Sequence, residues 1–163
     1  MNRNKLYSHR FLLVCLSVVI IVGIVIGVRA IAVGVKRKTD IAQIEKKYPT
    51  AVITPSGIRY IVEQSGNGPT AIAGRTVRIN YKGALLSGAV FDSSDVKGQP
   101  LEFELGAGQT IKGLDEAVIG MKEGEKRIVI IPPELGYGGK TMGKNAIPAN
   151  SFLVFDVELY RIR

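Results

Sequence analysis

Residues 110–121 read TIKGLDEAVIGM and form the one stretch of the chain with a clear helical period. Ile111, Leu114 and Val118 recur at i, i+3 and i+7, a spacing that places all three on one face of a short helix. The threonine that opens the stretch can serve near the N-terminus of this helix, and Gly120 is a candidate C′ residue at its end. The spacing therefore predicts one short amphipathic helix.

On both sides of this helix the apolar period changes to two, which is typical of half-buried strands. Val77, Ile79 and Tyr81, for example, alternate with polar residues. Similar strand-like runs occupy residues 58–62, 101–105, 126–131 and 151–162. A single helix cannot cover both faces of a sheet, so the sheet must curl its apolar face around the helix. We predict an α+β domain, an antiparallel half-barrel sheet curled around one short amphipathic helix.

The positive charge of the chain is concentrated in its first third. The 163 residues carry a formal net charge of +8, of which residues 1–50 contribute +7 and residues 51–163 only +1. A protein that follows a phosphate backbone needs a basic stripe on its folded part, and a nearly neutral domain does not supply one. We therefore expect no nucleic-acid partner.

An uncharged apolar segment of eighteen residues, 11–28, lies within this basic part. A helix rises 1.5 Å per residue, so this segment can just cross about 30 Å of hydrocarbon. We predict a transmembrane signal anchor. Cleavage near Ala32 is the alternative, because small residues flank that position. Gly23 and Gly27 form a G-x-x-x-G pair that would let two such helices approach each other in a weak homodimer.

The chain is therefore expected to contain four segments. They are a basic N-terminal flank (1–10), the signal anchor or transmembrane helix (11–28), a basic linker (29–53) and a globular domain (54–163). One short helix, near residues 41–46, is expected within the linker. The domain is expected to be exported whether the apolar segment is retained as an anchor or removed by cleavage.

Candidate ligands for a metal ion or a redox group are scarce in the sequence. Cys15 is the only cysteine and lies in the apolar segment, so no intramolecular disulfide can form. His9 is the only histidine and precedes that segment, and no cluster has metal-ligand spacing. We expect neither a metal ion nor a cofactor.

Four longer motifs follow one another through the predicted domain. They read VRINYKG (77–83), VFDSS (90–94), FELGAGQTIKGLDEAVIGMKEGEKRIVIIPPELGYG (103–138) and IPANSFLVFDVEL (147–159). From about Thr54 to Ile162 the chain closely resembles the FKBP-type peptidyl-prolyl cis–trans isomerases. The entry to the domain, TPSGIRYIVEQSGNGPTA, is similar to that of the exported bacterial members of this family, which agrees with the apolar leader.

The resemblance implies a set of site residues by position. Phe91 would form one wall of an apolar pocket, and Asp92 would be a polar point beside it, next to Tyr81. Tyr137 would bring its hydroxyl to a substrate carbonyl. The other substrate-binding positions that the resemblance implies are Leu101, Thr110, Ile111 (through its backbone N–H), Leu114, Ile147 and Phe155.

The chain departs from the family pattern at three positions. Leu114 occupies the place of a frequent Trp on the pocket floor, Leu101 replaces a frequent aromatic, and Lys97 lies near where an Arg often pairs with the carboxylate. We expect a roomier and less aromatic pocket, which affects turnover and macrolide affinity more than the fold.

Plainer interpretations of the site residues stay open at this point. Asp92 could close a turn onto Ser94, and Tyr81 and Phe155 could be ordinary core aromatics.

The expected activity is isomerisation of X–Pro bonds in exported or unfolded proteins, by removal of the amide from water and without a covalent intermediate. Macrolide inhibitors are expected as further ligands. The alternative is a membrane-tethered peptide-binding or chaperone module with little turnover, which Leu101 and Leu114 motivate. The expected location is the bacterial inner membrane in a single pass, with the domain on the periplasmic side, or the periplasm after cleavage near Ala32.

Overall fold

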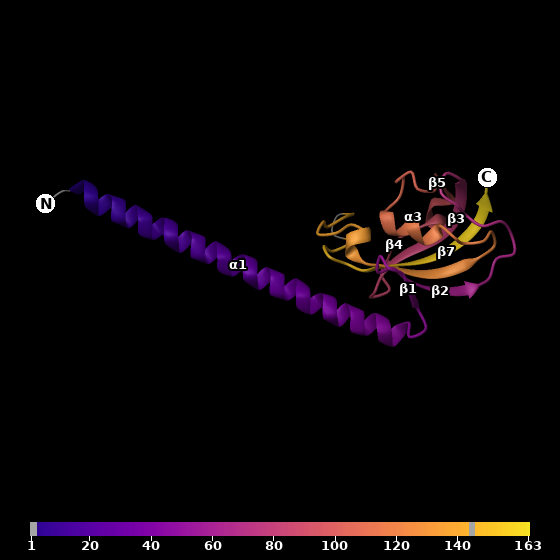
Figure 1. The fold of residues 1–163 in the computed structure, drawn as a ribbon, viewed down its shortest axis with the longest axis horizontal. Coiled ribbons are helices and arrows are strands. Elements are labelled where there is room, and N and C mark those ends of the chain that lie inside the picture. Colours follow the sequence, from indigo (N-terminus) through magenta and orange to yellow (C-terminus); the bar gives the residue numbers. More distant parts are fainter. Residues whose placement is uncertain (1–2, 144–145) are drawn as a thin grey trace. The chain divides into compact units, whose positions relative to one another are not determined.

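The structure is a computed structural model that describes the backbone of residues 3–143 and 146–163 and the side chains of residues 24–143 and 146–163. The chain divides into two compact units, residues 1–42 and residues 43–163. Most of one long helix, α1, makes up the first unit, and an antiparallel sheet with short helices makes up the second (Figure 1).

Helix α1 runs without interruption from Arg3 to Lys47. The sequence predicted a linker over residues 29–53 with only one short helix, but the helix continues through most of that segment. Its charged residues are good helix formers, and Lys36 and Asp40 form an i,i+4 ion pair at 2.7 Å on the helix surface. The segment between the apolar stretch and the domain is therefore mainly helical.

Much of the predicted membrane anchor, residues 11–23, lies outside the residues whose side chains the structure describes. The same is true of three other residues singled out in the sequence: Gly23 of the proposed dimer motif, Cys15 and His9. In the part of the chain that is described, no helix is both long enough and apolar enough to cross a membrane.

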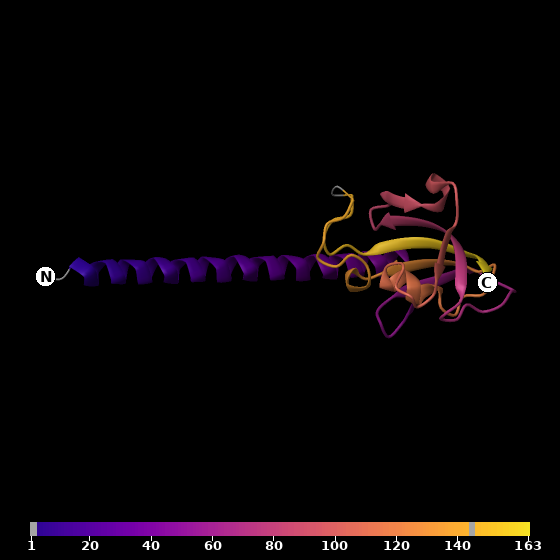
Figure 2. The same ribbon diagram turned by 90° about the horizontal axis from the view of Figure 1, so that it is seen from above.

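The second unit confirms the predicted antiparallel sheet with one amphipathic helix (Figures 1 and 2). Its strands follow the order β1-β2-β6-β7-β3-β4, and β5 pairs with β3 beside β4. The strands are β1 (Val52–Ile53), β2 (Arg59–Gln64), β3 (Thr76–Leu85), β4 (Val90–Ser93), β5 (Leu101–Glu104), β6 (Lys126–Ile131) and β7 (Leu153–Ile162). The helices after α1 are α2 (Ser94–Lys97) and α3 (Lys112–Val118), with a 3-10 turn, η1, at Pro133–Leu135.

Helix α3 is the helix that the TIKGLDEAVIGM stretch predicted. Leu114 and Val118 are buried in the core, and Ile111, the N-cap residue, packs against it. Gly120 adopts the left-handed conformation expected after a helix, with φ of +82°. Thr110 does not cap the helix, because its hydroxyl donates to the Ile111 carbonyl instead.

Helix α2 is a single capped turn that the sequence patterns did not reveal. The Val96 N–H donates to the Ser93 hydroxyl at 3.2 Å, and Gly98 ends the turn with φ of +69°. Lys97 is five residues beyond Asp92 in the sequence, and this turn brings it to the same side of the sheet edge as Asp92.

The outer face of the sheet changes character along its strands. At one end the paired Ile130 and Val154 are 0% and 8% exposed, although they point away from the main core. The last turn of α1 belongs to this unit, and its Ile44 is fully buried. Burial of Ile44 therefore extends the folded unit beyond the start that the sequence predicted, residue 54.

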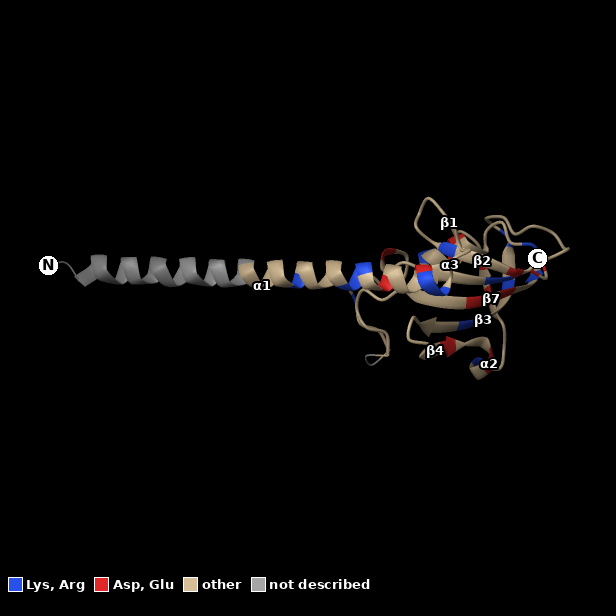
Figure 3. Cartoon of the chain, turned by 90° about the horizontal axis from the view of Figure 1, so that it is seen from below, with Lys and Arg blue, Asp and Glu red and all other residues tan. Residues whose placement is uncertain are grey.

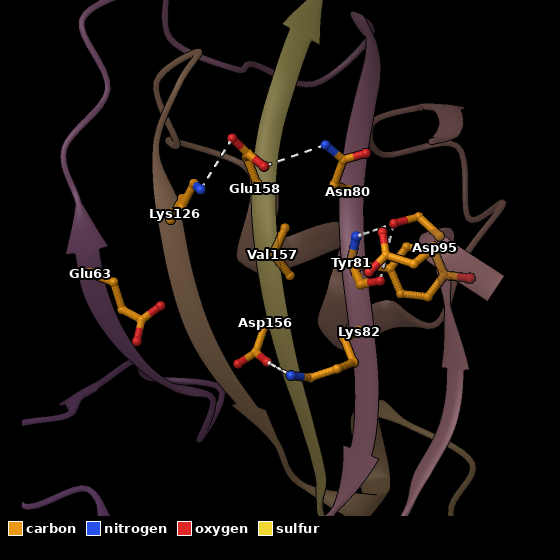
Figure 4. Close-up of a pocket in the computed structure, with 10 residues that line it drawn as sticks. Glu63, Asn80, Tyr81, Lys82, Asp95, Lys126, Asp156, Val157 and Glu158 are labelled. Carbon is orange, nitrogen blue, oxygen red and sulfur yellow. Dashed lines mark hydrogen bonds and ion pairs between the residues drawn. The ribbon is translucent and has the colours of Figure 1, made fainter. Parts of the chain in front are cut away.

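The other end of the outer face is polar and contains a shallow pocket (Figure 4). Lys82 pairs with Asp156 at 2.9 Å, and Lys126 lies 3.5 Å from Glu158. Figure 3 shows basic and acidic residues close together over this unit. The charges on the sheet thus form mixed pairs between neighbouring strands.

Candidate active site

Eight of the ten residues that the sequence assigns to the site meet in one apolar cluster inside the curled sheet. They come from four strands, from α3 with its N-cap, and from the loop between β6 and β7. Four are buried (Tyr81, Leu114, Ile147 and Phe155) and four are partly buried against them (Phe91, Leu101, Ile111 and Tyr137).

Aromatic rings form one side of this cluster. The Phe91 ring meets the Phe155 ring edge to face, with centroids 5.8 Å apart and an interplanar angle of 83°. The Tyr81 ring lies 6.3 Å from the same Phe155 ring at 41°. Tyr81 and Phe155 are therefore core aromatics that also border the predicted site.

The Asp92 carboxylate is held by two donors at the edge of the rings. Its Oδ2 accepts hydrogen bonds from the Tyr81 hydroxyl and from Lys97 Nζ, both at 2.7 Å. Lys97 also donates to the Tyr81 hydroxyl oxygen at 2.6 Å, which closes a three-residue network. These hydrogen bonds explain why a carboxylate lies next to Phe91, because Lys97 and Tyr81 compensate the charge of Asp92 at that position. They explain it better than a turn that Asp92 closes onto Ser94.

Each member of this network is stabilised in its ordinary charge state. Burial opposes ionisation of Asp92, but the hydrogen bonds from Lys97 and Tyr81 outweigh it and lower the pKa of the carboxyl. Hydrogen bonds to Asp92 and to Tyr81 raise the pKa of Lys97 to about 12. Burial raises the pKa of the Tyr81 phenol.

Some hydrogen-bond donors in the cluster have no partner among the described residues. They include the backbone N–H of Ile111 and the hydroxyl of Tyr137. The Ile111 carbonyl, in contrast, accepts from the N–H groups of Leu114 and Asp115. Burial and then the negative charge of Asp92 raise the pKa of Tyr137. Both donors are therefore open to an incoming carbonyl.

Known proteins are similar to this chain over its second unit. The model of the FKBP-type peptidyl-prolyl cis-trans isomerase family matches residues 68–160. This chain belongs to the FKBP family. FK506-binding protein 1A of Neurospora crassa is 47% identical over 108 residues, which cover 66% of this chain and 89% of that protein. A probable FKBP-type peptidyl-prolyl cis-trans isomerase of Haemophilus influenzae is 47% identical over 106 residues, or 65% of this chain and 43% of that protein.

A solved structure agrees with the family assignment. The crystal structure of FkpA from Escherichia coli matches with a TM-score of 0.69 and 36% identity, over 78% of this chain and 59% of that one. The chain is thus a peptidyl-prolyl cis–trans isomerase with the FKBP fold, as its motifs predicted. The narrower assignment to the exported bacterial members is not supported, because the similar FKBPs are mostly eukaryotic.

Two residues of this FKBP site were not assigned from the sequence. Lys97 had only been placed near the carboxylate, and the structure makes it a direct partner of Asp92. Ser94, 4% exposed, lies at a gap in the sheet, because β4 pairs with β3 from Lys82 onward and β5 only up to Ile79. Its hydroxyl accepts from the Tyr81 N–H at 3.0 Å and donates to the Tyr81 carbonyl at 3.3 Å. The Ser–Ser–Asp–x–Lys–Gly pattern of residues 93–98, with a capping serine first and a glycine last, is the sequence signal that could have revealed α2 and both residues.

The described residues contain no group of side chains suited to bind a metal ion. Among residues 24–143 and 146–163, no three His, Cys, Asp or Glu side chains are grouped so as to hold a metal ion.

We expect kcat/KM of this FKBP to be flat between about pH 5 and about pH 9, because Asp92, Lys97 and Tyr81 keep their charge states throughout that window. The lowered pKa of Asp92 stabilises the fold above the ordinary value of 3.8, and this contribution is lost as the pH falls through the folded value. A pH–rate profile with an X–Pro peptide tests this, and a bell-shaped profile centred near neutrality would contradict it.

Asp92→Asn is expected to keep the fold and to lower kcat/KM by about threefold to tenfold. The amide still accepts one hydrogen bond, but a neutral acceptor is weaker than a charged one by roughly 1 kcal/mol. Asp95→Asn, on the exposed side of α2, is the matched control and should leave kcat/KM unchanged. A folded but inactive Asp92→Asn protein would mean that the charge itself is essential.

Ser94→Ala is expected to lower kcat/KM by about threefold, because it leaves the buried Tyr81 N–H and carbonyl without partners and loosens the Tyr81–Asp92 contact. The effect should be much smaller when Tyr81 is already phenylalanine, since both substitutions act on the same hydroxyl. A double-mutant cycle in kcat/KM measures this coupling. Additive losses would show that Ser94 acts independently of the Tyr81 hydroxyl.

Proposed function

We propose that this FKBP accelerates rotation about X–Pro bonds by moving the amide out of water into the apolar cluster, with no covalent intermediate. The observation that carries the proposal is the combination of an aromatic, buried cluster with two donors that lack a partner in the described chain. Those donors, the Ile111 N–H and the Tyr137 hydroxyl, can hold the substrate carbonyls while the bond turns.

Physical chemistry explains why such a site needs no nucleophile. The X–Pro bond isomerises over tens to hundreds of seconds, because rotation breaks the amide resonance. Resonance separates charge between oxygen and nitrogen, and water stabilises that separation better than an apolar cluster does. The cluster therefore favours the twisted amide relative to the planar one, and fixed donors hold its orientation.

The decisive assay is NMR exchange between the cis and trans forms of an X–Pro peptide. A protein of residues 43–163 is suitable, because it retains the buried Ile44 that a start at residue 54 would remove. Catalysed exchange is expected, and Tyr137→Phe should reduce it by removing one open donor. Exchange no faster than in peptide alone would overturn the proposal.

We further propose that the enzyme is exported and membrane-tethered, and acts on proline-containing segments of exported or unfolded proteins. The support is the uncharged segment 11–28 with basic residues on both sides. In this proposal the domain lies on the periplasmic side of a bacterial inner membrane, with release after cleavage near Ala32 as the alternative. Gly23 and Gly27 then provide a contact for a weak dimer, which cross-linking of a Gly27→Leu variant would test.

Cell fractionation with N-terminal sequencing separates these outcomes. A membrane-bound protein that begins at Met1 supports the anchor, and a soluble periplasmic protein that begins near Val33 supports cleavage. An intact chain in the cytosolic fraction would contradict both.

A second candidate function is a peptide-binding or chaperone module with little turnover. Leu101 and Leu114 favour it, because they replace aromatic side chains with smaller ones in the cluster. It predicts suppression of aggregation that survives Asp92→Ala and Tyr137→Phe. Loss of that effect together with catalysis would contradict this reading. Macrolides such as FK506, which gives several relatives their names, should bind the same cluster less tightly than where both positions are aromatic.

A further inference from the structure

A cavity of about 370 Å³ lies beside Tyr81, outside the apolar cluster. It is located at the gap in the sheet where neither β4 nor β5 pairs with Tyr81. Its walls are formed mainly by Arg78, Tyr81, Lys97, Gln99, Leu101 and Glu102. Tyr81 and Leu101 also belong to the cluster or pack against it, so the cavity adjoins the place where the proline would bind.

Several hydrogen-bond donors around this cavity lack a partner in the described chain. Arg78 Nε is buried and makes no hydrogen bond to any described residue, although it lies 3.2 Å from a Glu102 oxygen. Lys97 uses two of its three N–H groups, on Asp92 and on Tyr81, and keeps one. The Gln99 side chain makes no hydrogen bond to the described part of the chain.

The charge around the cavity is also positive on balance. Glu102 is shared between Arg78 and Arg163, which lies 3.9 Å away, and Lys97 is compensated by Asp92. Among the residues that line the cavity, two cations, Arg78 and Lys97, face one carboxylate, Glu102. A planar guanidinium with free N–H groups is the side chain that best matches a carboxylate in geometry.

We infer that this cavity is a subsite for a carboxylate side chain, Asp or Glu, that lies one to three residues from the proline of the substrate. The inference rests on the proposed function, since it requires the proline to bind in the apolar cluster. An extended chain advances roughly 3.3–3.6 Å per residue, so such a side chain can reach from one site to the other across Tyr81 and Leu101. The substrates of this enzyme would then be enriched in acidic residues close to proline.

The test compares pairs of peptides that differ only by Glu or Gln, at each of the three positions before and after the proline. With the full chain in detergent micelles, we expect Glu to raise kcat/KM at one position or more by about twofold to fivefold, the range of a partly exposed ion pair. Raising the NaCl concentration to about 0.5 M should reduce the ratio, because salt screens such a pair.

Substitutions assign the preference to the cavity. Arg78→Gln should bring the Glu/Gln ratio close to one, and Arg78→Lys should keep part of it, because the charge remains without the planar fork. Arg75→Gln is the matched control, since Arg75 is exposed and does not line the cavity, and it should keep the full ratio. The Glu/Gln ratio is taken within each variant, so a general loss of activity in that variant cancels out of it.

Two outcomes overturn the inference. One is a parent ratio near one at all six positions, and the other is a preference that survives Arg78→Gln. The rate of isomerisation of the Gln peptides is measured separately. If the enzyme does not accelerate it, the proposed function is contradicted rather than the subsite.

Discussion

Phe91→Ala is expected to lower kcat/KM for an X–Pro peptide by at least about tenfold in a protein that still folds, an effect of about 1.4 kcal/mol or more on the barrier. The ring packs edge to face on Phe155 and is only partly buried, so it borders the site rather than the deep core. Without it, water enters next to the amide and again stabilises the planar, charge-separated form. Exchange NMR gives the rate, and thermal unfolding gives the stability of the same sample.

The stability loss for Phe91→Ala should be smaller than the roughly 3–5 kcal/mol typical of a fully buried Phe. Ile162→Ala is the matched control, because Ile162 is also partly buried against the core but lies at the end of β7. It should reduce the unfolding midpoint while leaving kcat/KM close to that of the parent. If Phe91→Ala isomerises as fast as the parent, desolvation by the ring is not the source of catalysis.

The fold could be predicted from the sequence where a single period dominates. The stripe of α3 and the alternation of β3 are set by burial of one face, and the structure has both. Strand β1 could not be predicted, because it pairs through only Val52 and Ile53, both exposed. The long course of α1 was missed because its charged part has no apolar stripe, and helix propensity alone is a weak signal.

The residues that make up the site could be predicted from the sequence, but the hydrogen bonds and ion pairs between them could not. The resemblance supplied the aromatic and apolar residues, and the fold brings them together. It did not show that Lys97 compensates Asp92, because that contact depends on the one-turn helix α2. Ser94 was missed for a related reason, since its partner is the backbone of Tyr81 at a gap between two strands. Gaps of this kind arise from the pairing register, which side-chain patterns do not reveal.

Gly83 shows a further requirement that alternation in β3 conceals. It lies opposite Asp92 on β4 and opposite Phe155 on β7, at a register shift in the pairing with β4. A Cβ atom there would lie 2.8 Å from two atoms of the Phe91 ring and 2.9 Å from the Phe155 ring. A glycine within a strand often marks such a close approach. The edge-to-face packing of the two rings therefore depends on the missing side chain.

Gly83→Ala is accordingly expected to lower kcat/KM by about tenfold or more and to cost about 1–3 kcal/mol of stability, the range for added atoms in a packed site. Phe155 is 3% exposed and cannot retreat, so the partly buried Phe91 ring must turn away and open the wall of the site. Gly34→Ala, with nothing within 4 Å of the added atom, is the control and should leave kcat/KM unchanged.

The combination of Gly83→Ala with Phe91→Ala distinguishes a steric cause from a backbone one. Removing the Phe91 ring makes room for the methyl group, so the stability loss of the double variant should be smaller than the sum of the two single losses. Catalysis should not recover, because the wall of the site is still absent. Additive stability losses would place the effect of Gly83 in the backbone of β3, and a fully active Gly83→Ala protein would mean that the two rings tolerate a side chain between them.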